Sequence, residues 1–206
     1  YEAKSIGGLI IKYWNLFSLT MKNSLFGKFV WTGGLAFRKR DAEKLEIKRL
    51  LATHLSDDMS FSRLLAEKKY NIFSVKNYTL SETDKTVWGA LKWISRQQFM
   101  GYNYYPYLHY INIISLFLHI IFLIFFITTL NILYLLPFFS IFIVIFYFSV
   151  RYGNLEETIA TPLIFVLFII NTFYSSIFPM LTRKIEWAGI VYELDRNGRV
   201  INRYPV

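Results

Sequence analysis

The longest apolar pattern of the chain runs from residue 97 to residue 150, without one Asp, Glu, Lys or Arg. A helix needs roughly 20 apolar residues to cross a bilayer core, so this stretch is long enough for two spans. A third apolar segment, 161–181, follows a short charged interval. Helices that are apolar on every face are typical of the membrane interior, where each helix satisfies its own backbone groups. We predict spans at 108–130, 132–150 and 161–181, of which two or three cross fully.

The residues before this block alternate between short apolar and short charged runs. Trp14, Phe17 and Met21 fall three to four apart, which predicts an amphipathic helix, either in the core of a soluble domain or at a bilayer surface. Strand-like runs at 29–31, 35–37 and 70–80 alternate with a helix capped by Asp41 and a helix at 59–69. This succession predicts an α/β layer that is too short to be a complete nucleotide-binding domain.

Residues 84–100 predict a helix that lies in the membrane interface. Lys85, Lys92 and Arg96 fall on one face of this helix, and Trp88 stands among the apolar residues of the rest. An aromatic belt at the membrane surface follows, formed by Tyr102, Tyr104, Tyr105, Tyr107 and Tyr110. At the other end of the apolar block, residues 183–206 alternate polar and apolar positions around Asn-Gly at 197–198, which predicts a β-hairpin.

The distribution of charged residues along the chain favours one orientation of the protein in the membrane. The 206 residues carry a net charge of +9, with +8 before residue 107, −1 over 107–182 and +2 over 183–206. Basic flanks beside a membrane block favour the cytoplasmic side and an anionic partner. Nucleic acid is disfavoured, because the basic residues are interspersed with acidic ones. Three full spans would put the two basic flanks on opposite sides of the membrane, and the sequence does not resolve this conflict.

Asp57 and Asp58 are the sharpest candidates for chemistry. Two adjacent carboxylates before a helix can hold a divalent cation, or one of them can act as a general base. Acidic residues at a helix start are equally typical of capping and of a favourable interaction with the helix dipole. Both interpretations stay open from the residues alone.

Two weaker candidates accompany the acidic pair. Arg96 and Gln97 could bind a diphosphate or sugar hydroxyls. Alternatively, the aliphatic part of the Arg96 side chain packs on apolar surface while its charged group stays in water. Gly33 and Gly34 permit close approach of a substrate, or form a turn. No metal site is predicted, because the chain has no cysteine and the three histidines lack the spacing of a metal pair: His54, His109 and His119.

Several short motifs follow one another in a recognisable order. They are Trp-Thr-Gly-Gly at 31–34 with Phe-Arg-Lys at 37–39, the acidic pair before a helix, Trp93-x-x-Arg96-Gln97, the apolar block, and Trp187-x-Gly189-x-x-Tyr192-x-Leu194. In this order they resemble the C-terminal half of membrane-bound family 2 glycosyltransferases, the ceramide glucosyltransferase-like enzymes above all. The resemblance covers most of residues 29–106 and the tail.

The resemblance implies a fold class and a reaction. It implies a partial α/β domain of the Rossmann-like GT-A type over 1–106, an α-helical transmembrane bundle of two to three spans over 107–182, and a β-hairpin tail over 183–206. Asp58 would be the general base that deprotonates an acceptor hydroxyl as it attacks the anomeric carbon of a nucleotide sugar. Substrate-binding roles would fall to Asp57, Gly33, Gly34, Trp93, Arg96 and Gln97.

The implied partners are a nucleotide-sugar donor, a lipid acceptor and the membrane, with the catalytic part on the cytoplasmic side of the plasma membrane. A divalent cation, Mg²⁺ or Mn²⁺, is also implied, but the Asp-x-Asp site that would hold it is absent from this sequence. We therefore expect the chain to begin within a larger protein and to be inactive alone.

Two positions depart from the family pattern. Its Arg-Trp pair would fall on Phe99 and Met100, and Ala188 replaces the usual Arg of the tail motif. The alternative hypothesis is a non-catalytic membrane scaffold or transporter subunit whose basic flank binds a partner. Transport is disfavoured, because the spans hold no ionisable residue except at their ends and at His109 and His119.

Overall fold

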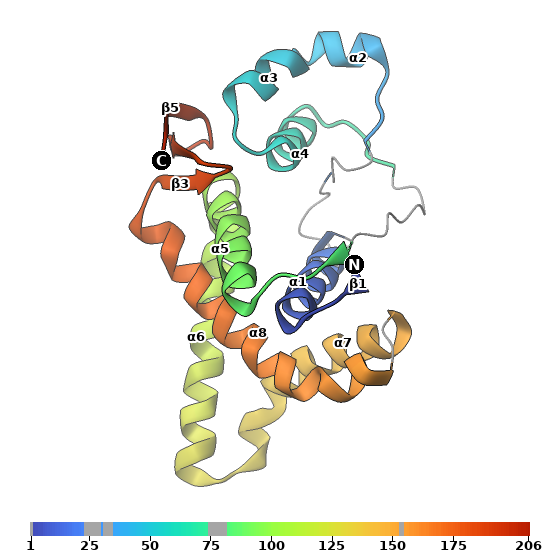
Figure 1. The fold of residues 1–206 in the computed structure, drawn as a ribbon, viewed down its shortest axis with the longest axis vertical. Helices are drawn as coiled ribbons and strands as arrows, with labels where there is room; N and C mark the ends of the chain where they lie inside the picture. The colour runs from blue at the N-terminus through green and yellow to red at the C-terminus, as the bar shows by residue number, and fades with distance from the viewer. Residues whose placement is uncertain (1, 23–29, 31–34, 74–81, 153–154) are drawn as a thin grey trace.

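The computed structural model of the chain describes residues 2–22, 30, 35–73, 82–152 and 155–206, and these are mostly helical (Figure 1). The α-helices are α1 (Ile6–Lys22), α2 (Lys39–Lys44), α3 (Ile47–Thr53), α4 (Asp57–Glu67), α5 (Val87–Tyr104), α6 (Pro106–Thr129), α7 (Leu136–Tyr152) and α8 (Leu155–Leu181). A short 3₁₀ helix, η2 (Ile132–Leu135), precedes α7. The strands are β1 (Glu2–Ala3), β2 (Glu82–Thr83), β3 (Lys184–Trp187), β4 (Ile190–Leu194) and β5 (Val200–Pro205).

Helix α5 is the centre of the molecule, because α1, α4, α6 and α8 all pack against it. The helix begins at Thr86, whose hydroxyl accepts a hydrogen bond from the Gly89 N–H at 3.0 Å. Its apolar residues Ala90 and Ile94 are fully buried against Ile10 and Ile11 of α1. The helix predicted at 84–100 is thus confirmed, with its start three and its end four residues later, while its placement in a membrane interface stays a prediction.

Helix α1 is a core helix, the first of the two interpretations of its sequence. Lys12 of α1 is only 6% exposed. α1 contacts α5, α7 and α8, so more than one of its faces is covered. The periodicity of the sequence revealed one apolar face and not the second contact.

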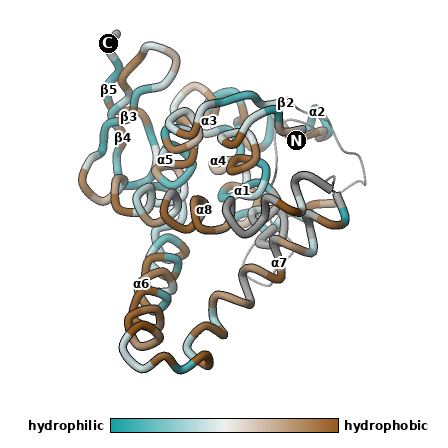
Figure 2. Tube along the Cα trace, turned by 60° about the horizontal axis from the view of Figure 1, so that its bottom comes forward, coloured by the Kyte–Doolittle hydropathy of each residue, from teal (hydrophilic) through white to brown (hydrophobic). Residues whose placement is uncertain are grey.

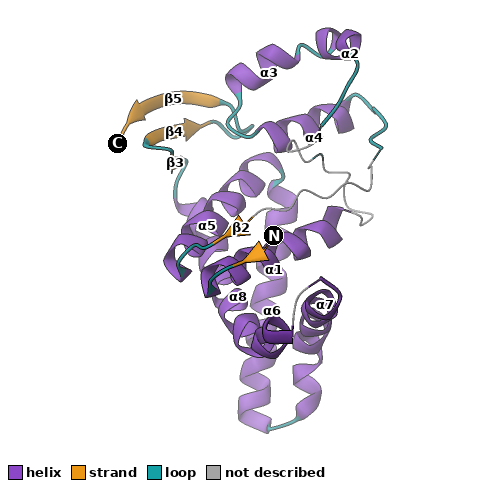
Figure 3. Cartoon of the chain, turned by 45° about the vertical axis from the view of Figure 1, so that its right-hand side comes forward, coloured by secondary structure: helices purple, strands orange, loops and turns teal. Residues whose placement is uncertain are grey.

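Helix α6 extends away from the rest of the molecule, and after a turn the chain returns through η2 to α7, which packs against α8 and α1 (Figures 1 and 3). The chain turns at Leu130, in the left-handed conformation with φ of 54°, and the Asn131 side chain then accepts from the Leu133 N–H at 3.0 Å. Hydrophobic residues cover α6 along most of its length (Figure 2). Within the described residues, α6 is the one helix long and apolar enough to cross a membrane, and its apolar window is 6% buried.

The other predicted spans are helical but have different bounds. The segment 132–150 divides into η2 and the 17-residue α7. The segment 161–181 is the later part of α8, which begins at Leu155 inside the predicted 151–160 loop.

The expected Rossmann-like α/β layer is absent from the described residues. Residues 35–37 form no strand, and β1 and β2 make only a two-residue parallel pair. The predicted strands 29–31 and 70–80 lie largely outside the described residues. Val30 shows why the α/β prediction failed there: its N–H donates to the Ser62 side chain at 2.8 Å and not to a neighbouring strand. Alternating apolar residues were read as strands, but a strand needs a partner that local sequence does not supply.

The tail is a three-stranded antiparallel sheet in the order β3-β4-β5. The predicted hairpin around Asn197 and Gly198 is confirmed as the β4–β5 connection, and a second tight turn at Ala188 and Gly189 joins β3 to β4. Gly189 and Gly198 have φ of 75° and 77°, the left-handed region that glycine adopts without strain.

The sheet covers the end of α5 beside the α3–α4 connection (Figure 1). Phe99 of α5 is fully buried with Ile185 and Leu194 of the sheet. A β-bridge also joins His54 to Arg199. The tail and the acidic pair of α4 therefore lie at the same end of the molecule.

Candidate functional site

The acidic pair stands in the first turn of α4. The N-cap residue is Ser56, whose hydroxyl accepts from the Met59 N–H at 3.2 Å. Asp57 is exposed and its Oδ1 accepts the Asp58 N–H at 2.9 Å, while Asp58 is half-buried. Because Ser56 performs the capping, the carboxylate of Asp58 is not required to start the helix, although both acids gain from the helix dipole.

Hydrogen bonds hold α4 from its buried side. Ser62 donates through its hydroxyl to the Asp58 carbonyl at 2.7 Å and accepts the Val30 N–H at 2.8 Å. This hydrogen-bonded chain joins the first turn of α4 to the residue that lies just before the Trp-Thr-Gly-Gly motif. Gly33 and Gly34 themselves lie outside the described residues.

Tyr104 holds α4 from the other side. Its hydroxyl accepts the Ser56 N–H at 3.2 Å and donates to the Gly198 carbonyl at 2.9 Å. Burial raises the pKa of Tyr104 to about 12, because the protein interior disfavours the phenolate. Sequence analysis placed Tyr104 in an exposed aromatic belt, and this was wrong: Tyr104 is 3% exposed, whereas Tyr107 and Tyr110 are exposed.

The three candidates on α5 have different surroundings. Trp93 packs against the α1–α5 core. The Arg96 guanidinium lies over the Trp187 ring of β3 at 4.8 Å, and its buried Nε has no hydrogen-bond partner. Burial lowers the pKa of Arg96 from its usual value. Gln97 is half-buried. Arg96 is therefore stacked inside the protein and does not reach freely into water.

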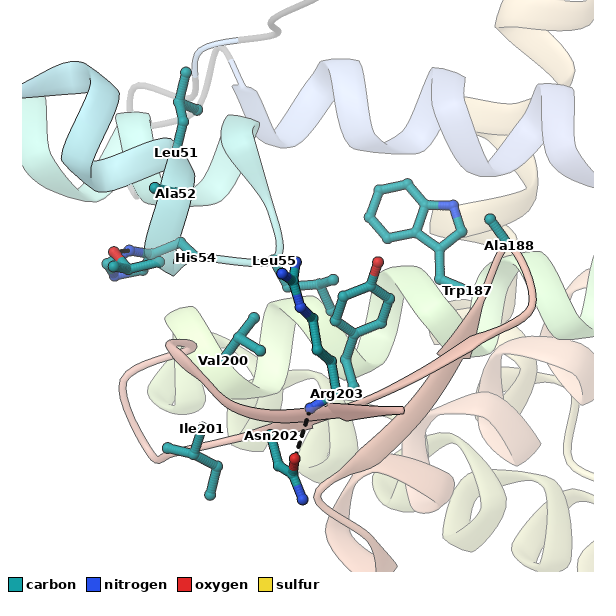
Figure 4. A pocket seen from close by; sticks show the side chains of 12 residues that line it. Leu51, Ala52, His54, Leu55, Trp187, Ala188, Val200, Ile201, Asn202 and Arg203 are labelled. Atoms are coloured by element: carbon teal, nitrogen blue, oxygen red, sulfur yellow. Dashed lines mark hydrogen bonds between the residues drawn. The ribbon is translucent and has the colours of Figure 1, made fainter. Parts of the chain in front are cut away.

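A groove of about 610 Å³ opens between the α3–α4 connection and the tail sheet (Figure 4). Its wall on the α3 side comes from residues 51–55, which end just before the Ser56 cap. Its other wall includes Trp187, Tyr192 and Arg203 of the sheet. The groove thus brings the tail motif of the sequence next to the acidic pair, a proximity that the sequence did not predict.

Sequence analysis also did not identify a polar seam between α5, α6 and α8. Ser95 of α5 donates to Ser175 of α8 at 3.1 Å. His109 of α6 meets the Ser176 carbonyl at 2.9 Å, and Asn112 donates to the Ser176 hydroxyl at 3.1 Å. The signal in the sequence was the Ser-Ser pair within an apolar helix, because polar side chains among apolar helices commonly hydrogen-bond across them.

The described residues do not fit a resident divalent cation. They contain no group of three or more His, Cys, Asp or Glu side chains placed to hold a metal ion. Asp57 and Asp58 alone supply fewer ligands than such an ion takes. We therefore derive no chemical step through a metal.

The chain was compared with known protein families, with curated proteins and with solved structures, and none of the three comparisons found a match.

Proposed function

We propose that this chain is part of a membrane-bound glycosyltransferase that moves a sugar from a nucleotide-sugar donor to a lipid or other membrane-associated acceptor. The observation that supports this most is the placement of the acidic pair. Asp58 stands at a Ser56-capped helix start that is held by Ser62 on one side and Tyr104 on the other. The same α5 that ends at Tyr104 continues, after one residue, into the apolar helix α6. A carboxylate fixed beside a bilayer surface suits deprotonation of a lipid hydroxyl.

In the proposed reaction, the acceptor oxygen attacks the anomeric carbon of the donor sugar. The bond from that carbon to the diphosphate oxygen breaks, and its electron pair leaves with the nucleotide. Asp58 takes the proton of the acceptor hydroxyl. Asp57 holds the Asp58 N–H through its Oδ1 and thereby supports the geometry of the turn.

Arg96 is the candidate cation for the departing diphosphate. Its positive charge persists even with a lowered pKa, and its guanidinium lies over the Trp187 ring, so its role toward the diphosphate stays a prediction from the family resemblance. The roles of Gln97, Trp93, Gly33 and Gly34 in substrate binding stay predictions from the family resemblance. For Trp93, its packing on the α1–α5 core favours a positioning role.

The membrane part of the proposal rests on α6. Its most apolar 18-residue window has a mean hydropathy of 2.5, within a helix of 24 residues. At 1.5 Å per residue they extend about 36 Å, more than the roughly 30 Å of a hydrocarbon core. Insertion of the α6–α7 hairpin would leave α4, α5 and the tail on one side of the bilayer, where the basic flanks favour the cytoplasm.

The test is Asp58→Asn in membranes that contain the full-length protein. Transfer of radiolabelled sugar from a nucleotide-sugar donor into extracted lipid is expected to fall by about 10²–10⁴-fold, the usual worth of a general base. Asp57→Asn is the matched control and is expected to retain most activity, because the amide oxygen can still accept the Asp58 N–H. If Asp58→Asn keeps most of the activity at unchanged protein level, Asp58 is not the base. If the wild-type protein transfers no sugar, the scaffold hypothesis gains instead.

A further inference from the structure

The groove beside the acidic pair presents a cation without an acidic counterpart. Arg203 of β5 lies opposite Tyr192 of β4 in the sheet register, and its side chain points across the groove toward Leu55 (Figure 4). No Asp or Glu lines the groove. Within the described residues, the Arg203 guanidinium has no carboxylate within ion-pair distance. An arginine in this setting is free to bind an anion.

The acidic residues of the tail are directed elsewhere. Alternation along the strands places Lys184 and Glu193, which are paired in register, on the opposite face of the sheet from Tyr192 and Arg203. Asp195 folds back on its own turn, where its Oδ1 accepts the N–H groups of Asn197 and Arg199 at 2.8 and 2.9 Å. The acidic side chains Glu193 and Asp195 of the tail are therefore directed away from the groove.

A second guanidinium lies next to the groove. Trp187 lines the groove and also carries Arg96, which is not one of the lining residues, over its ring at 4.8 Å. The groove itself therefore combines the Arg203 cation with the aromatic side chains of Trp187 and Tyr192. This combination suits an amphiphilic ligand with an anionic group better than a neutral, purely polar one.

The groove lies near the end of α8. Trp187, the first residue of the tail that lines the groove, follows Leu181, the last residue of α8, by six residues, which limits their separation to roughly 20 Å. The last turns of α8 expose apolar side chains toward this end, namely Ile177, Phe178, Met180 and Leu181. A lipid at this position has apolar surface for its chains and a cationic groove for its headgroup.

We propose that this groove binds the phosphate-bearing headgroup of an anionic membrane lipid, with the phosphate on Arg203 and the acyl chains along the end of α8. The proposal rests on the membrane insertion in the proposed function and deepens it, because the groove wall at Leu55 stands three residues before Asp58. The acceptor of the transferase would then be a lipid with a phosphate in its headgroup.

The experiment measures binding and not turnover. Dioctanoyl phosphatidic acid is titrated into the detergent-solubilised protein by isothermal calorimetry. Arg203→Gln is expected to weaken binding about tenfold, the loss of one charge-assisted contact. Lys184→Gln is the matched control: it removes the same charge from the opposite face of the same sheet, and its affinity is expected to stay within about twofold of wild type. Arg203→Lys, which keeps the charge, is expected to lose about threefold.

Two outcomes would overturn the proposal. Equal weakening by Arg203→Gln and Lys184→Gln would mean that the lipid senses only the general surface charge. Displacement of the lipid by a nucleoside diphosphate or by inorganic phosphate at similar concentrations would mean that the groove recognises a soluble phosphate and not a lipid. Asp58→Asn is expected to bind the lipid as wild type does, so a failure of sugar transfer with intact lipid binding would count against the proposed function alone.

Discussion

Tyr104 joins three parts of the molecule through one hydroxyl group. The hydroxyl is hydrogen-bonded to the N-cap residue of α4 and to the turn of the β4–β5 hairpin, and the ring lies in the last turn of α5. Both partners are backbone groups, so their hydrogen bonds do not depend on the identity of Ser56 or Gly198. The Tyr104 side chain is therefore one of the contacts that fix the acidic pair relative to the tail.

Tyr104→Phe keeps the ring and removes only the hydroxyl. The Ser56 N–H and the Gly198 carbonyl are then left without that partner in a buried place, which costs about 1–3 kcal/mol of folding free energy. The expected result is a lower midpoint of thermal unfolding in detergent. Tyr107→Phe, at a residue that is 54% exposed, is the control and should unfold with wild type. An unchanged midpoint for Tyr104→Phe would show that water replaces the hydroxyl at no cost.

The same variant has a distinct pH dependence. Tyrosine in the unfolded chain ionises near pH 10, whereas burial raises the pKa of Tyr104 to about 12 in the fold. The stability contribution of the neutral hydroxyl is therefore complete below pH 10 and is lost as the pH rises toward 12. The difference in stability between wild type and Tyr104→Phe should shrink over this interval. Tyr105, whose pKa burial also raises, is present in both proteins and cancels in the comparison.

Single residues were predictable where their role is local. The Ser56-Asp57-Asp58 sequence indicated a helix start, and the structure places it there. Tyr104 was not predictable, because a tyrosine before an apolar helix is typical of an interface belt and its burial depends on the tail, 94 residues away. The Arg96–Trp187 contact, across a comparable distance in the chain, escaped prediction for the same reason.

At the scale of elements, the β4–β5 hairpin depends on a glycine that contacts α5. Gly198 has φ of 77°, and a Cβ added there would overlap the Tyr104 ring. Gly189 has nearly the same φ of 75°, but a Cβ there would meet nothing within 4 Å. The two positions differ in packing and not in backbone strain.

This pair gives a matched test of tail docking. Gly189→Ala should cost about 1–2 kcal/mol, the strain of a left-handed alanine. Gly198→Ala should cost about 1–3 kcal/mol more, because the Tyr104 ring must move and its hydroxyl contacts with it. Denaturant or thermal unfolding of the two variants would measure the difference. Equal losses would show that the hairpin lifts from α5 without energetic cost.

Helices were more predictable than sheets in this chain. The apolar runs of α6 and α7 and the seven- and four-residue spacing in α5 are local patterns, and the helices lie close to the predicted ranges. The expected α/β layer failed because short apolar runs do not show whether a partner strand exists. The third tail strand was also unforeseen, because the Ala188-Gly189 turn carries a weaker signal than Asn197-Gly198.

At the scale of the whole molecule, the tail and α4 are joined by the His54–Arg199 bridge, the Tyr104 hydrogen bonds and the Phe99 cluster. These contacts require both to be on one side of any membrane that α6 crosses. The chain must then return after α6, and α7 turns back toward α1 and α8 (Figure 1).

The absence of cysteine makes this topology directly testable, because every introduced thiol is the only one in the chain. Ile201→Cys in the tail and Lys68→Cys after α4 should react with a membrane-impermeant maleimide from the same side of sealed vesicles. Leu133→Cys, exposed at the tip of the α6–α7 hairpin, should react only from the other side. Reaction of Ile201→Cys and Lys68→Cys from opposite sides would contradict the docked tail, because a sheet across the bilayer cannot contact α5. It would also remove the groove, since its two walls would then face different compartments. Reaction of all three from one side would instead show that the hairpin lies along the surface without crossing.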